Sequence, residues 1–113
     1  MVRMVIIGPP GVRILILEEI VGWVQLAGEF DDPEAALRFE GSWCGLVVGA
    51  ELGFLYAQRL AGHFGQNSTS RVIRVRLNGE TLEGEGDPSE ARLGITTCSL
   101  DDFPAVISGL VVP

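Results

Sequence analysis

The segment between residues 80 and 90 holds the densest cluster of side chains that could do chemistry. Its five carboxylates are Glu80, Glu83, Glu85, Asp87 and Glu90. Oxygen ligands of this kind can hold calcium, but the D-x-D-x-D-G spacing of a calcium loop is absent. The same charges would keep a strand edge soluble and would attract a basic surface of another protein. We therefore expect these five residues to form an acidic binding face, and we expect no metal site.

Hydroxyl side chains precede this cluster and suggest a second kind of chemistry. Ser68, Thr69 and Ser70 come just before a strand-like run, and Glu83 and Glu85 lie beyond it. The two tripeptides resemble the Ser-Thr-Ser strand start and the Glu-x-Glu pair of one class of ADP-ribosyltransferases. The resemblance is confined to these tripeptides. It implies that Glu85 would polarise a ribose hydroxyl while Ser68 or Thr69 braces the pocket.

The chain has no lysine, since all eight basic residues are arginines. Walker-type phosphate loops and Schiff-base enzymes both need a lysine amine, so neither is expected. The N-terminal VIIGPPG looks like the strand and turn that open many nucleotide-binding folds, but Gly11-Val12-Arg13 stands where Gly-Lys-Ser/Thr is required. Pro9 and Pro10 also remove amides that would hold phosphate. We interpret this segment as a hairpin turn, and we expect no cofactor.

The charge balance restricts the choice of partner. Fifteen carboxylates give a net charge of −7, which opposes nucleic acid and favours a basic protein surface. Cys44 and Cys98 lack C-x-x-C spacing, so no zinc site follows; free buried thiols are expected, with one disulfide as the alternative. No apolar stretch is long enough for a signal sequence or a membrane span. We expect a cytoplasmic protein without membrane contact.

Hydrophobic patterning predicts about six strands. The apolar runs cover residues 1–8, 12–17, 20–30, 43–49, 71–77, 80–85 and 93–98. The run over 20–30 either extends the strand over 12–17, which gives six strands, or forms a separate short strand. Alternation would point Ile73 and Val75 inward and place Arg74 and Arg76 on the solvent face, paired with the acidic return strand. Asn78-Gly79 is a strong hairpin signal, and it predicts an antiparallel connection from 71–77 to 80–85.

Three or four short helices complete the predicted elements. Asp32 can cap a helix over 33–40 that has proline at its first position, and Asp87-Pro88 repeats the pattern. Apolar residues at one-face spacing predict a helix over 50–63. Asp102 and Pro104 open a short C-terminal helix.

These elements predict one α+β domain over residues 1–113, with a mixed or mostly antiparallel sheet of about six strands. Size, acidity and the lack of a catalytic motif favour a non-enzymatic protein that binds another macromolecule, of the inhibitor, immunity or anti-defence type. A homodimer remains open. The alternatives are the small ADP-ribosyltransferase-like enzyme above and a self-assembling structural subunit. No catalytic residue is assigned in the first interpretation.

Overall fold

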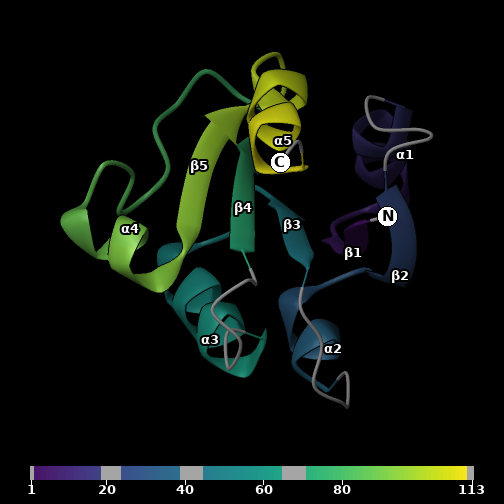
Figure 1. Ribbon diagram of the computed structural model, residues 1–113, viewed down its shortest axis with the longest axis horizontal. Coiled ribbons are helices and arrows are strands. Elements are labelled where there is room, and N and C mark those ends of the chain that lie inside the picture. The colour runs from purple at the N-terminus through teal and green to yellow at the C-terminus, as the bar shows by residue number, and fades with distance from the viewer. Residues whose placement is uncertain (1, 19–23, 39–44, 65–70, 112–113) are drawn as a thin grey trace.

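The computed structural model describes residues 2–18, 24–38, 45–64 and 71–111, and its strands and helices alternate along the chain (Figure 1). The strands are β1 (Val2–Ile7), β2 (Val24–Phe30), β3 (Leu46–Ala50), β4 (Arg71–Arg76) and β5 (Ile95–Ser99). The helices are α1 (Pro10–Glu18), α2 (Pro33–Leu37), α3 (Phe54–Phe64), α4 (Pro88–Leu93) and α5 (Phe103–Val111).

All five strands run parallel in a single sheet of order β2-β1-β3-β4-β5. The prediction of a mixed or mostly antiparallel six-stranded sheet is therefore wrong. A parallel sheet needs a crossover between successive strands, and a helix supplies each crossover here. Its inner strands are buried on both faces, as the continuous apolar run of β3 reflects.

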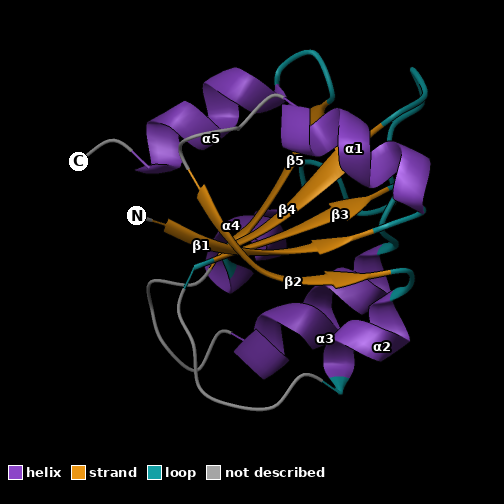
Figure 2. Ribbon diagram, turned by 90° about the vertical axis from the view of Figure 1, so that its right-hand side faces the viewer, coloured by secondary structure: helices purple, strands orange, loops and turns teal. Residues whose placement is uncertain are grey.

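The helices cover the sheet in two layers (Figure 2). Helices α1 and α5 lie on one face, and α2, α3 and α4 lie on the other. Each layer closes over its own apolar cluster. Val5, Val47 and Leu60 belong to the cluster beneath α2 and α3, whereas Ile6 and Ile16 belong to the one beneath α1 and α5. Adjacent strand residues thus point into opposite cores.

Helix α1 occupies residues that patterning assigned to a hairpin turn and a second strand. Pro10 takes the first helical position, where its missing amide costs nothing and its φ already suits a helix. Ile16 is buried, and Val12 and Leu17 pack beside it, so one helical stripe provides all the contact with the core. A short apolar run does not distinguish a strand from a helix, and here it forms the crossover from β1 to β2.

The second predicted hairpin is also absent. Asn78-Gly79 opens a connection that crosses to α4, and residues 80–85 contain no strand. Other local predictions are confirmed: Asp32 accepts a hydrogen bond from the Ala35 amide and caps α2, and Asp87 caps α4 from the Ser89 amide. Side-chain caps depend on residues three positions away at most, so they can be identified without the fold.

The connection from β4 to α4 packs tightly against α3 at one glycine. Gly84 has a φ of 78°, and a Cβ atom there would overlap the ring of Phe54. Gly86 has a similar φ of 83° but open space around it. A side chain at Gly86 would meet only backbone strain, whereas a side chain at Gly84 would meet the same strain and a steric overlap with Phe54.

We expect Gly84→Ala to destabilise the protein more than Gly86→Ala does. Both changes place a side chain at positive φ, but only the first forces the Phe54 ring to move, at a cost of about 1–3 kcal/mol. Urea unfolding followed by tryptophan fluorescence measures the difference. Equal losses of unfolding free energy would contradict the tight contact.

Candidate functional site

The carboxyl ends of the strands are the first place to look for a site. In open parallel sheets, ligands bind outside these ends, at the point where the strand order reverses direction. That point lies between β1 and β3, the two neighbours whose chains leave toward opposite layers. The residues that follow these two strands are Gly8 and Pro9 after β1 and Glu51 after β3.

Arg13 of α1 occupies one side of this edge. Its Nη1 donates to the Gly8 carbonyl oxygen at 2.7 Å and to the Asp31 carboxylate at 2.6 Å. Its Nε lies 3.4 Å from Glu29 Oε1. The hydrogen bond that Arg13 donates to Asp31 is the main cause that raises the pKa of Arg13. This guanidinium therefore joins α1 to β2 and is engaged by the protein's own oxygens.

Glu51 occupies the other side in a strained conformation. Its φ of 50° makes it the one non-glycine residue at positive φ among the described residues. The carboxylate accepts hydrogen bonds from the amides of Leu77 and Asn78 at 2.7 and 3.0 Å, and the Glu51 amide donates to the Val75 carbonyl. The left-handed turn thus holds the end of β3 against the end of β4. The Glu51 carboxylate is therefore bound by backbone amides of the same protein.

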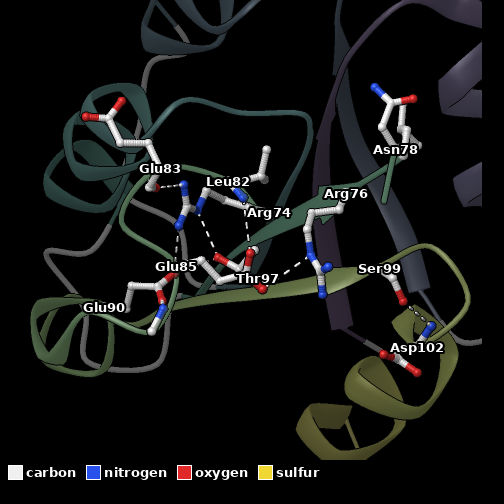
Figure 3. A network of polar contacts seen from close by, with 12 residues as sticks. Arg74, Arg76, Asn78, Leu82, Glu83, Glu85, Glu90, Thr97, Ser99 and Asp102 are labelled. Atoms are coloured by element: carbon white, nitrogen blue, oxygen red, sulfur yellow. Dashed lines mark hydrogen bonds and ion pairs between the residues drawn. The ribbon is translucent and has the colours of Figure 1, made fainter. Parts of the chain in front are cut away.

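A larger polar network lies on the face of β4 that α3 and α4 cover (Figure 3). Arg74 is completely buried at its centre, although alternation had placed it on the solvent face with Arg76. The alternation itself is correct, because Ile73 and Val75 point into the opposite core. The error came from assuming that one face of the strand is solvated, which a parallel sheet does not permit.

Every part of the Arg74 guanidinium has a partner. Nε donates to Thr97 Oγ1 at 2.9 Å, Nη2 to Glu90 Oε2 at 2.9 Å, and Nη1 to the carbonyl oxygens of Glu83 at 2.6 Å and Leu52 at 3.5 Å. The guanidinium carbon also lies 5.3 Å from the centre of the Phe54 ring. Such complete satisfaction is what allows a cation to be buried.

Glu90 is the anionic counterpart and is buried as well. Burial alone would raise its pKa, but hydrogen bonds from Thr97, Arg74 and the Gly86 amide, with the charge of Arg74, outweigh that effect and lower it. Thr97 Oγ1 lies 2.6 Å from Glu90 Oε2, so it accepts from Arg74 and donates to Glu90. Glu90 is thus ionised at neutral pH, and the Thr97 hydroxyl links it to Arg74.

The five residues of the predicted acidic face have different environments. Glu90 is bonded to Arg74, Glu85 pairs with Arg76 at 3.3 Å, and Asp87 caps α4. Glu80 and Glu83 are exposed, and Glu83 contacts Arg74 only through its backbone oxygen. The cross-strand salt bridges expected with a return strand over 80–85 do not form, because that segment is a loop. Arg76 pairs with Glu85 of this loop, and Arg74 pairs with Glu90 of α4.

The hydroxyl tripeptide of Ser68, Thr69 and Ser70 lies outside the described residues, as does Cys44. Glu83 and Glu85 sit in the connection from β4 to α4, and the Glu85 carboxylate also accepts from the Leu82 amide at 3.1 Å. Cys98 of β5 is free and buried. Burial, followed by the charge of Asp102, raises the pKa of its thiol to about 11. A thiol of that acidity is a poor nucleophile at neutral pH.

The described residues contain no group of three or more side chains placed to hold a metal ion. Within the same residues, no helix is long and apolar enough to cross a membrane. Arg74, Thr97 and Glu90 were the residues whose joint role sequence reasoning missed. Alternation marked Arg74 as opposite in direction to Ile73, but only the position of α4 brings Glu90 to it.

Comparison with solved structures shows a likeness in fold. No protein-family model matches the chain, and no curated protein matches it. The isolated REC (receiver) domain of RcsB from Salmonella enterica serovar Typhimurium, solved in the apo form, is similar in fold. The TM-score is 0.60 at 14% sequence identity, over 96% of this chain and 84% of that one. The likeness therefore concerns the fold.

This finding overturns the functional interpretations drawn from an α+β domain. The inhibitor, immunity or anti-defence type, and the homodimer associated with it, are wrong for a chain whose structural neighbour is a receiver domain. The ADP-ribosyltransferase-like enzyme and the self-assembling subunit are also withdrawn. The enzyme interpretation relied on two tripeptides, of which Glu83 and Glu85 contact Arg74 and Arg76 within the fold. The subunit interpretation relied on the edges of an α+β sheet that the structure does not have.

We expect Arg74→Met to destabilise the fold strongly, because it leaves the Glu90 carboxylate buried without its cation. Loss of one partner of a buried pair costs about 3–5 kcal/mol. The double variant Arg74→Met/Glu90→Met should recover much of that loss, since no charge is then buried. Urea unfolding of the wild type, both single variants and the double variant measures the coupling. A strictly additive double variant would contradict it.

Cys98 should resist thiol reagents in the native state. In a Cys44→Ser background, Ellman's reagent at pH 8 should react with Cys98 only as fast as the protein unfolds, because the thiol is buried and protonated. Addition of urea should restore the rate of a free cysteine. Rapid native labelling would show that the site is open to solvent.

Proposed function

We propose that this chain is a receiver-like signalling module that acts by binding a basic partner protein through the outward face of α1. One observation carries the proposal. Ile14 and Leu15 point away from the core, with 57% and 47% of their surface exposed. Two adjacent large apolar side chains on a helix surface have no structural task in the monomer, and clustered exposed apolar groups are typical of interaction sites.

The layer formed by α1 and α5 is nearly devoid of charge. Arg13 and Glu18 are its only charged residues, and α5 has none along FPAVISGLV. Arg13 faces the β2 edge, where Glu29 and Asp31 neutralise it. The opposite layer, in contrast, carries charges on α2, α3 and α4. Depletion of charge at the centre of a patch distinguishes interfaces from ordinary surface.

Acidic groups flank this apolar face and support a basic partner. Glu18 is exposed at the end of α1, and the Glu29 and Asp31 side chains are 44% and 78% exposed beside Arg13. Around Arg13, the two carboxylates of Glu29 and Asp31 exceed the single positive charge and leave a net negative charge. A second copy of the chain would bring like charges together, so a different protein with cations around an apolar centre is the better complement.

Binding is favoured over catalysis by the state of the carboxyl edge. Arg13 and Glu51, which lie on the two sides of the reversal point of the sheet, are both hydrogen-bonded to the protein itself. Leu26 is exposed on the edge strand β2. It lies on the same side of the sheet as Val24, and Val24 packs against the apolar cluster beneath α1. The apolar surface therefore continues from α1 toward the sheet edge.

We expect Leu15→Asp and Ile14→Asp each to weaken partner binding at least about tenfold, the effect of losing a central apolar contact. Leu55→Asp is the matched control, because Leu55 is 68% exposed on α3 in the opposite layer. A photoreactive phenylalanine is introduced at position 14 or 55, because amine cross-linkers find no lysine side chain on this protein. The partner is identified by mass spectrometry and its affinity measured by calorimetry.

Cross-linking from position 14 to a basic protein, lost in Leu15→Asp and retained in Leu55→Asp, is the expected outcome. Equal cross-linking from both positions would contradict a specific α1 face. If cross-links form only between copies of the chain, the α1 face mediates self-association, and the proposal of a different partner protein is wrong. Raising the salt concentration should weaken the complex, because the flanking carboxylates are exposed.

A further inference from the structure

Helix α4 is attached to the rest of the molecule in an unusual way. Glu90 is its only buried residue, while Ala91, Arg92 and Leu93 are exposed. Neither apolar cluster contains a residue of α4. Helices of globular proteins are normally held by an apolar stripe. This one is held by a carboxylate.

The contacts of Glu90 converge on the Arg74 network (Figure 3). Its Oε2 meets Arg74 of β4 and Thr97 of β5, and its Oε1 accepts from the Gly86 amide at 2.7 Å. From α3, the Phe54 ring covers the guanidinium. Arg74 is the charged group that acts on Glu90 from the neighbouring elements. Nearby in the chain, Asp87 caps α4 and Arg92 lies in its last turn.

Glycines bound α4 on both sides at positions that favour bending. Gly84 and Gly86 precede the helix at positive φ, and Gly94 ends it with a φ of 74°. The helix keeps its own N-cap, since Asp87 Oδ1 accepts from both the amide and the hydroxyl of Ser89. A capped helix between glycines can leave the sheet as a unit once its anchor is lost.

We propose that residues 82–93 form a releasable flap, closed by the Arg74–Glu90 pair, that opens while the five-stranded sheet stays folded. Opening breaks the Arg74 bond to the Glu83 carbonyl and the Arg76–Glu85 pair, and it lifts Gly84 from Phe54, so the β4–α4 connection and α4 move together. Protonation of Glu90 is the trigger. Because the two apolar clusters are independent of α4, they remain intact.

The direction of the pH dependence follows from the contacts. The pKa of Glu90 is lowered in the closed state from its ordinary value of 4.5. Its contribution to closure is therefore complete above pH 4.5 and is lost as the pH falls through the lowered value. The flap should open on acidification, before the sheet unfolds.

Hydrogen exchange with mass spectrometry tests the proposal on the full chain. Glu90→Gln removes the charge and keeps the shape; at pH 7 the amides of 82–87 and 89–93 should exchange at least about tenfold faster, with β1 and β3 unchanged. Glu34→Gln is the matched control, since it breaks the half-exposed Glu34–Arg59 pair between α2 and α3. It should leave α4 unaffected.

Two outcomes would overturn the flap. Equal acceleration in α4 and the central strands would make α4 part of the global folding unit, and no acceleration would show that the ion pair does not hold it. A second experiment measures hydrogen exchange of the wild-type protein from pH 7 to pH 3. The rates are corrected for the intrinsic pH dependence of exchange. Protection in α4 must fall at higher pH than protection in β1, and this experiment decides if Glu90→Gln does not fold.

Discussion

The burial of one cation organises half of this structure. Arg74 lies within a parallel sheet, where neither face is open to water, and a guanidinium can stay there only if its donors are all satisfied. Meeting that requirement brings together a carbonyl before α4, a carboxylate on α4, a hydroxyl on β5 and a ring on α3. The β4–α4 connection follows the path that delivers these groups.

The opposite half is organised by apolar burial and leaves its outer surface uncharged. Ile16 and Phe103 close the core beneath α1 and α5, while Ile14 and Leu15 remain outside. In the proposals made above, the two sides of the sheet have separate roles: the polar contacts of Glu90 close the α4 flap, and the exposed apolar residues of α1 bind a partner. At the carboxyl edge between them, Arg13 and Glu51 are engaged internally.

Sequence reasoning succeeded where the signal is local and failed where it depends on pairing. The structure confirms that Asp32 and Asp87, each followed by proline, cap helices. It also confirms that Ile73 and Val75 point away from the face of Arg74. Each of these predictions depends on neighbouring residues. Asn78-Gly79 failed as a hairpin signal. A turn dipeptide shows only that the chain bends, and the return strand also needs an edge to pair with, whereas α4 and β5 occupy the space beyond β4.

The sequence by itself determined an acidic, lysine-free, apolar-rich domain, the helix caps and the alternation of β4. It also placed Arg74 and Arg76 opposite acidic residues of 80–85, and of these pairings the one between Arg76 and Glu85 forms. Only the tertiary structure decided that the strands are parallel, that residues 10–18 form a helix, and that Arg74 is buried against Glu90. The physical reason is that charge and capping act over a few residues, whereas strand direction and burial are set by contacts between residues far apart in the chain.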